Sequence, residues 1–78
     1  MILKLNYFGM VAEAVGKEEE LYDFSNRTVE ELNQQLKERY ANLGELSYNF
    51  AINHSIVENS HVLNEQDEIA LLPPFAGG

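Results

Sequence analysis

Hydrophobic side chains alternate with polar ones along the opening run from Ile2 to Phe8. Leu3, Leu5 and Tyr7 are separated by single polar residues, and this period of two is typical of a strand with one buried face. Ile2 and Phe8 belong to the opposite face of the same strand. The pattern therefore predicts a half-buried strand that carries large apolar side chains on its outer face.

Two helices are predicted beyond this strand. Gly9 interrupts the alternation, and apolar residues then recur at one-turn spacing, so a short helix should close at Gly16. The longer helix begins after Thr28, a good N-cap, and Glu31 lies three residues later to complete a capping box. This helix should end near Tyr40. Its apolar stripe consists of Val29, Leu32, Leu36 and Tyr40.

Four further segments predict strands. The first begins with the acidic run Glu18–Glu20, which also fits a solvated loop, and the second is rich in aromatic and β-branched residues. Turn-forming residues at 53–55 and 65–67 separate the later segments. In chain order, the predicted strands are 18–24, 48–52, 56–57 and 68–72.

The predicted elements follow the order strand, short helix, strand, long helix and three strands. An α+β fold of the grasp type fits this order, with one mixed sheet of four or five strands and the long helix packed across it. The first and last strands of such a chain commonly pair as parallel neighbours in the centre of the sheet. We place the domain at residues 1–72 and a flexible C-terminal tail at 73–78.

Length and composition narrow the classes of protein and partner. A chain of 78 residues forms one small domain, and 45% hydrophobic residues is ordinary for a globular one. The net charge of −8 disfavours nucleic acid and membrane surfaces as partners and favours a basic protein surface. The absence of cysteine excludes disulfides, thiolate metal sites and cysteine nucleophiles. Because neither a signal peptide nor a membrane span is predicted, we expect a cytoplasmic protein.

The side chains show no pattern typical of a catalytic site. His54 and His61 lack a His or carboxylate partner at the spacing of metal ligands, so we expect solvent-facing loop residues and no metal. The run Glu18–Glu20 is expected to be a solvated face. Glu30 and Glu31 are not interpreted as an acid–base pair, because nothing suggests that they are buried. If the protein takes part in a reaction, its backbone must carry the reacting group.

The last six residues, Pro-Pro-Phe-Ala-Gly-Gly, form the most informative segment. One interpretation is a frayed end, as most termini are. Against it, Pro73 and Pro74 stiffen the exit from the last strand, and Phe75 adds an apolar anchor. Gly77 and Gly78 have no side chains, so a terminal carboxylate on this segment could pass through a narrow channel into another protein's active site.

A carboxylate presented in this way could take part in a reaction in the active site of another protein. ATP-dependent adenylation of Gly78 would give a reactive mixed anhydride, and a sulfur nucleophile could displace AMP to leave a thiocarboxylate. This route needs no cysteine, because sulfur replaces the terminal oxygen. The acyl-adenylate and the thiocarboxylate are the expected covalent intermediates, and no bound cofactor is expected.

An apolar patch is the second candidate site. If the first and last strands are neighbours, Phe8 and Leu72 share the outer face beside the exit of the tail, and Ile56 extends the patch. Scattered surface hydrophobes are the alternative, since they are common in monomers. We favour an interface, because exposed apolar clusters tend to mark one. The predicted partner-binding residues are Phe8, Ile56, Leu72, Phe75, Pro73 and Pro74.

The sequence resembles the small, sulfur-carrying subunit of molybdopterin synthase, the MoaD-type branch of the ubiquitin-like β-grasp proteins. The likeness extends over nearly the whole chain, and the Pro-Pro-Phe-Ala-Gly-Gly ending is its most specific motif. The related sulfur carrier of thiamine synthesis has a similar Gly-Gly end, but it is usually shorter and lacks the double proline. Gln66 and Ala12 depart from the family, which often has glycine and a basic residue at these two positions.

This resemblance implies a role in molybdenum cofactor biosynthesis. An E1-like adenylyltransferase would activate Gly78, and a sulfur donor would convert it to the thiocarboxylate. Gly77 would be the neighbouring residue that has no side chain to obstruct the channel. The carrier would insert its tail into the large subunit of molybdopterin synthase, in a heterotetramer, and deliver sulfur to cyclic pyranopterin monophosphate. It would not be an enzyme on its own, because the family's catalytic side chains belong to the large subunit. The family's partner contacts fall at Phe8, Ile56 and Leu72.

Three alternatives stay open on the sequence alone. The same chemistry could serve thiamine, cysteine or tRNA thiolation. The chain could instead be a β-grasp binding module whose Gly-Gly end is incidental, or a ubiquitin-like protein that is conjugated to lysine. Loading of sulfur at Gly78 would separate the carriers from the binding module.

Overall fold

The computed structural model describes residues 1–25 and 27–74. The strands and α-helices agree with the sequence prediction to within one residue at their ends, and the short 3-10 helix had not been predicted. In chain order, the elements are β1 (Ile2–Tyr7), α1 (Gly9–Val15), β2 (Glu19–Asp23), α2 (Val29–Arg39), the 3-10 helix η1 (Ala41–Glu45), β3 (Asn49–Ile52), β4 (Ser55–Val57) and β5 (Glu68–Leu72).

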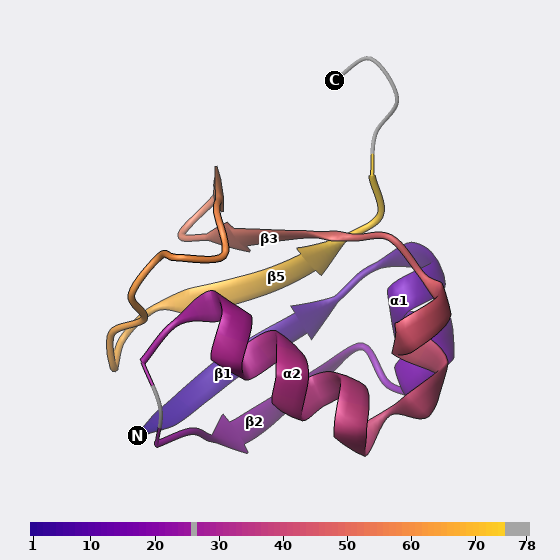
Figure 1. Cartoon of the computed structure of the whole chain (residues 1–78), viewed down its shortest axis with the longest axis horizontal. Helices are drawn as coiled ribbons and strands as arrows, with labels where there is room; N and C mark the ends of the chain where they lie inside the picture. The colour runs from indigo at the N-terminus through magenta and orange to yellow at the C-terminus, as the bar shows by residue number, and fades with distance from the viewer. Residues whose placement is uncertain (26, 75–78) are drawn as a thin grey trace.

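The strands form one five-stranded sheet in the order β2-β1-β5-β3-β4. β1 and β5, which come from opposite ends of the chain, pair in parallel at the centre, and the other neighbours are antiparallel. Figure 1 shows α2 lying across one face of the sheet, with α1 and η1 at one end of it. The expected α+β, β-grasp architecture with a central parallel pair is confirmed.

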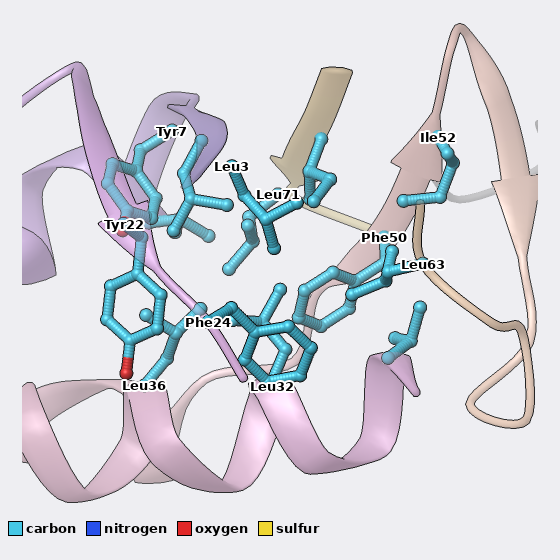
Figure 2. Packing of buried hydrophobic residues seen from close by; sticks show 14 of the residues in the cluster. Leu3, Tyr7, Tyr22, Phe24, Leu32, Leu36, Phe50, Ile52, Leu63 and Leu71 are labelled. Carbon is cyan, nitrogen blue, oxygen red and sulfur yellow. The ribbon is translucent and has the colours of Figure 1, made fainter. Parts of the chain in front are cut away.

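A single hydrophobic core fills the space between α2 and the sheet (Figure 2). The predicted phase of β1 is confirmed, because Leu3, Leu5 and Tyr7 are buried. Leu32 and Leu36 of α2 are also fully buried in this core, as the apolar stripe predicted. The remaining members of the cluster are Val11, Val15, Tyr22, Phe24, Val29, Leu43, Phe50, Ile52, Leu63, Ile69 and Leu71.

Both ends of α2 follow the sequence signals. The Glu31 N–H donates to the Thr28 hydroxyl oxygen (3.3 Å), and the Thr28 N–H donates to the Glu31 carboxylate (2.9 Å), so the predicted capping box is confirmed. The helix ends at Arg39, with Tyr40 as its C-cap, and the chain continues into η1, which buries Leu43. No helix in the described parts of the chain is long and apolar enough to cross a membrane.

The β3–β4 hairpin closes through a two-residue turn. Asn53 (φ 51°) and His54 (φ 76°) both adopt the left-handed region, as a type I′ turn requires, and Ile52 pairs with Ser55. The turn predicted at 53–55 is thus confirmed at its first two residues, whereas Ser55 already belongs to β4. The Asn53 side chain also accepts the N–H of Glu68 at 3.0 Å, which ties the hairpin to the start of β5.

The two departures from the family are accommodated locally. Gln66 lies in an exposed turn and outside the left-handed region, so this position does not require glycine. The turn is held by Asp67, whose carboxylate accepts the Asn64 N–H at 2.8 Å. Ala12 is half-buried and packs against the core, which explains why a small apolar residue suits α1 here.

Candidate functional site

The sheet face opposite α2 carries a row of outward-pointing residues from four strands. The pairing register aligns Asn6 of β1 with Ala70 of β5, Ala70 with Ala51 of β3, and Ala51 with Ile56 of β4. Successive side chains on a strand point to opposite faces, so this row lies on the face away from Leu5, Ile69 and the core. Small alanines at its centre, with larger side chains around them, leave a depression.

This depression, here called the outer hollow, has a volume of about 390 Å³ and is mostly apolar. Phe8 and Ile56 are 47% and 59% exposed, and Leu72 is half-buried beside them. The structure therefore brings together the three side chains that were expected to share an outer patch, although their role in binding stays a prediction. The outer hollow is lined by Asn6, Phe8, Ala51, His54, Ile56, Glu68, Ala70 and Leu72.

The two ends of the outer hollow differ in chemistry. Phe8 and Leu72 lie where β1 and β5 end, next to the start of the tail. His54 and Glu68 lie toward the start of β5, with His54 Nε2 3.8 Å from Glu68 Oε1, and both side chains are exposed. The outer hollow is thus apolar beside the tail and polar at its far end.

The described part of the tail consists of Pro73, which is half-buried, and Pro74, which is exposed. The Phe8 N–H donates to the Leu71 carbonyl at 3.2 Å and so continues the β1–β5 pairing up to the base of the tail. Phe75, Gly77 and Gly78, the other predicted tail residues, lie outside the described residues. The outer hollow and the base of the tail adjoin one another at Leu72.

The two histidines lie in different settings. His54 is exposed in the β3–β4 turn, as expected. His61 is half-buried instead of fully solvent-facing, and its carbonyl accepts the Val29 N–H at the start of α2. Within residues 1–25 and 27–74, no group of three or more His, Asp or Glu side chains is placed to hold a metal ion.

Comparison with known proteins identifies the family. Residues 5–78 match the ThiS family. The chain belongs to this family. Molybdopterin converting factor subunit 1 from Pyrococcus furiosus is similar to this ThiS-family chain in structure, with a TM-score of 0.88, 22% identity, and coverage of 96% of this chain and 99% of that one.

Two further solved structures are similar at slightly higher identity. Small archaeal modifier protein 1 from Methanosarcina acetivorans is 26% identical, with a TM-score of 0.75 and coverage of 100% of this chain and 99% of its own. The complex of subunits 1 and 2 of molybdopterin-converting factor from Helicobacter pylori contains a chain that is 25% identical, with a TM-score of 0.68 and full coverage of both. The ThiS-family chain therefore shares its fold both with molybdopterin-converting factor subunits and with a small archaeal modifier protein.

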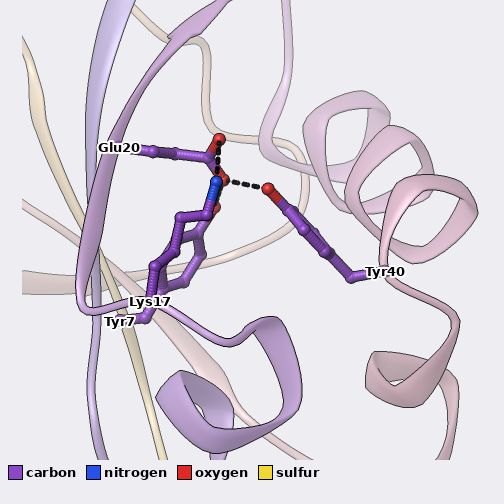
Figure 3. A network of polar contacts seen from close by, with 4 residues as sticks. All are labelled: Tyr7, Lys17, Glu20 and Tyr40. Atoms are coloured by element: carbon purple, nitrogen blue, oxygen red, sulfur yellow. Dashed lines mark hydrogen bonds and ion pairs between the residues drawn. The ribbon is translucent and has the colours of Figure 1, made fainter.

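The polar cluster around Glu20 corrects the sequence interpretation of this ThiS-family chain. Glu20 was expected on a solvated face, but only 9% of its side-chain surface is exposed. Its Oε2 atom accepts hydrogen bonds from the hydroxyls of Tyr7 (2.5 Å) and Tyr40 (2.7 Å), and Lys17 Nζ lies 3.7 Å from Oε1 (Figure 3). The cluster joins β1, β2 and the end of α2, so its role is structural.

Burial and hydrogen bonding shift the pKa of the Glu20 carboxyl in opposite directions. Burial alone would raise its pKa, but the hydrogen bonds from Tyr7 and Tyr40, with the charges of Lys17 and Arg39, outweigh burial and hold the pKa below its ordinary value. Burial, followed by the hydrogen bond to the Glu20 carboxylate, raises the pKa of the Tyr7 hydroxyl. The pair is therefore stabilised as a neutral tyrosine and a charged carboxylate.

We expect Glu20→Gln to lower the free energy of unfolding by about 1–3 kcal/mol at neutral pH, because the two tyrosine hydroxyls lose a charged acceptor. The lowered pKa of Glu20 contributes stability above the unfolded carboxyl's pKa of about 4.3, and this contribution is lost as the pH falls through the folded value. Urea unfolding at neutral and acid pH measures the free energy of unfolding of each variant and how it changes with pH. The control is Glu19→Gln, an exposed neighbour; equal pH profiles for both variants would contradict the prediction.

Sequence reasoning missed the floor of the outer hollow. Ala51 and Ala70 are placed opposite each other only by the β3–β5 register, which the sequence pattern leaves undetermined. A usable signal existed, since Ala70 takes the outward phase of the last predicted strand. Small residues at outward positions flanked by larger apolar ones indicate a depression.

Proposed function

We propose that this chain is a sulfur carrier of molybdenum cofactor biosynthesis and acts as the small subunit of a molybdopterin synthase. The coarser assignment rests on the family: the chain is a ThiS/MoaD-type sulfur carrier or ubiquitin-like small modifier. The ThiS-family match, which extends through Gly77 and Gly78, supports the sulfur-carrier part of the proposal, and the similarity to a chain of the Helicobacter pylori molybdopterin-converting factor complex supports the molybdenum pathway. The outer hollow beside the base of the same tail supports it.

The proposed reaction proceeds in two steps at the Gly78 carboxylate. A carboxylate oxygen attacks the α-phosphorus of ATP on an E1-like adenylyltransferase, and pyrophosphate leaves. Hydrosulfide supplied by the sulfur donor then attacks the acyl carbon, the bond to AMP breaks, and the thiocarboxylate remains. In the large subunit, this sulfur passes to cyclic pyranopterin monophosphate, water cleaves the acyl–sulfur bond and regenerates the Gly78 carboxylate, and two carriers in turn supply the dithiolene. The residues that catalyse the transfer are assigned to the large subunit.

The outer hollow is the proposed docking surface of the carrier. Phe8, Ile56 and Leu72 present apolar area next to the tail, so a partner that covers them would also hold residues 73–78 in register. The net charge of −8 would speed encounter with a basic groove. The two components of the Helicobacter pylori complex are subunits 1 and 2 of a molybdopterin-converting factor, which is the type of assembly proposed here.

Conjugation to lysine is the second candidate function. Its support is the similarity to the small archaeal modifier protein, which spans the whole of this chain. Both functions begin with the acyl-adenylate of Gly78, and they diverge in the nucleophile that displaces AMP: sulfur in a carrier, the ε-amine of a lysine in a modifier. Carriers for thiamine, cysteine or tRNA thiolation would share the sulfur step and differ in the acceptor.

Intact mass spectrometry after incubation with an E1-like adenylyltransferase, ATP and a sulfur source tests the proposal. We expect the mass gain of one oxygen-to-sulfur exchange, dependent on ATP. The loaded carrier should then lose its sulfur in the presence of the large subunit and cyclic pyranopterin monophosphate. Sulfur that is loaded but never transferred would assign another thiolation pathway, and a covalent adduct with a second protein would assign the modifier function.

Alanine substitutions test the docking surface. We expect Phe8→Ala and Leu72→Ala each to weaken binding to the large subunit by about 1 kcal/mol or more, because each removes apolar area from the outer hollow without emptying the core. Calorimetric titration measures the dissociation constants. Leu21→Ala is the matched control, since Leu21 is 72% exposed but does not line the outer hollow. Titration curves of the two test variants that overlay the parent would rule out this surface.

A further inference from the structure

Gly9 and Pro73 meet where the two central strands end. β1 and β5 run in parallel, and the hydrogen bond from the Phe8 N–H to the Leu71 carbonyl lies at the end of this pairing, where the two strands separate. Beyond it, Gly9 opens α1 and Pro73 opens the tail. A Cβ atom at Gly9 would lie 2.8 Å from Pro73 Cγ and 3.7 Å from Pro73 Cδ. The absence of a side chain at Gly9 is therefore what makes room for the Pro73 ring.

The backbone at Gly9 also has a conformation that favours glycine. Its φ of +56° lies in the left-handed region, where a side chain is strained even in open space. Gly16, which closes α1, has φ +88°, but a Cβ there would have no neighbour within 4 Å. The two glycines thus share a left-handed backbone, and only Gly9 has the contact with the tail.

The Pro73 ring has little freedom to avoid such a clash. Ring closure fixes its φ near −65°, so Cγ can shift only by a change of ring pucker, a smaller movement than the end of a flexible side chain could make. Pro73 also lines a second hollow of about 200 Å³, here called the tail-base hollow. The tail-base hollow is lined by Met10, Val11, Glu45, Leu46, Ser47, Pro73 and Pro74. A displaced Pro73 ring would therefore change the direction in which the chain leaves the sheet.

We propose that Gly9 is a positioning residue for the reactive tail: its bare backbone seats the Pro73 ring and so sets the direction in which the chain leaves β5 at Pro73 and Pro74. This inference rests on the proposed function, since it gives Gly9 a role in delivering the Gly78 carboxylate. The docking side chain Phe8 precedes Gly9 in the chain. A residue of the proposed docking surface, Phe8, is therefore bonded directly to Gly9, which contacts the base of the tail at Pro73.

The test compares Gly9→Ala with Gly16→Ala in ATP-dependent thiocarboxylate formation. We expect Gly9→Ala to lower kcat by about 10- to 100-fold, because the terminal carboxylate is misplaced in the activating enzyme. The KM for the carrier should change by no more than about twofold, because the folded surface away from the tail is unchanged. Gly16→Ala introduces the same strain without the contact, so its kcat should stay close to that of the parent. Equal kcat values for Gly9→Ala and the parent would overturn the proposal.

Removal of the Pro73 ring completes a double-mutant cycle. In the Pro73→Ala background, Gly9→Ala should cost much less in kcat than it does alone, because the atoms with which its Cβ collides are gone. If Gly9→Ala fails to fold, the double variant should fold, since the clash is relieved. An unfolded double variant, or costs that multiply independently, would overturn the proposal.

One measurement does not depend on sulfur chemistry. In the parent and in Gly16→Ala, NMR should detect a nuclear Overhauser contact between the Gly9 Hα protons and the Pro73 ring, and Gly9→Ala should shift the Leu72 amide signal. If these signals behave as expected but no chain accepts sulfur, the proposed function fails and the positioning of the tail stands. If the parent accepts sulfur and the contact is absent, only the positioning of the tail fails.

Discussion

A chain with one lysine added after Gly78 is expected to fold like the parent and to gain no sulfur. The proposed activation takes place at the carboxylate of Gly78, and the added residue would convert that carboxylate into an amide and move the terminal charge outward. Deletion of Gly78 should have the same effect, because the carboxylate then ends one residue short of the reacting atoms, where small misplacements are costly. Intact mass after incubation with the adenylyltransferase, ATP and a sulfur source measures the loss, which should be complete.

The added lysine provides its own control. A carboxypeptidase specific for basic residues removes it and stops at glycine, and this treatment should restore sulfur loading of the same preparation. Thermal unfolding of the extended and the trimmed chains should coincide, because the core lies within residues 3–71. An extended chain that still gained sulfur at its terminus would contradict the carrier function.

Leu36→Ala is expected to lower the free energy of unfolding by about 2–5 kcal/mol, because it leaves a cavity in the centre of the core. Leu36 is fully buried and belongs to the same cluster as Leu5 and Ile69 of the two central strands. A domain of this size has a total stability of about 4–12 kcal/mol, so one substitution removes a large share of it. Denaturant unfolding at neutral pH measures the change.

Lys37→Ala serves as the control for this prediction, since Lys37 is the next residue of α2 and is exposed. Both variants place a good helix former in the same helix, so a difference between them reports burial and not helix propensity. The exposed substitution should change stability by no more than about 0.5 kcal/mol. Identical unfolding curves for Leu36→Ala and Lys37→Ala would mean that the apolar stripe has another phase.

Local patterns predicted most of the architecture. The alternation in β1 determined which side chains are buried, because a strand that packs on one face repeats every two residues. The Thr28 and Glu31 pair located the start of α2, since the capping box depends on residues only three apart. The pairing of the first and last strands, which is not local, followed from the order of the elements and was confirmed. The same phase placed Phe8 and Leu72 together on the outer face.

Features that depend on distant segments escaped the prediction. Glu20 was misassigned because the groups that bury it, Tyr7 and Tyr40, come from β1 and the end of α2. The contact between Gly9 and Pro73 joins residues at opposite ends of the sequence, and no spacing rule connects them. The five residues of η1 are too few to show a hydrophobic period, so the burial of Leu43 was not apparent.

The central parallel pairing of β1 with β5 links the assembly of the proposed docking surface to the completion of folding. Phe8, Ile56 and Leu72 come from three well-separated segments, and they adjoin only after β5 has entered the sheet between β1 and β3. Contacts between such distant segments form late and cooperatively, because closing the long intervening loop costs entropy first. A partially folded or newly synthesised chain thus has a Gly-Gly end but no outer hollow beside it. An activating enzyme that requires both features would act only on fully folded molecules. Completion of the fold would then be a condition for loading sulfur at the Gly-Gly end.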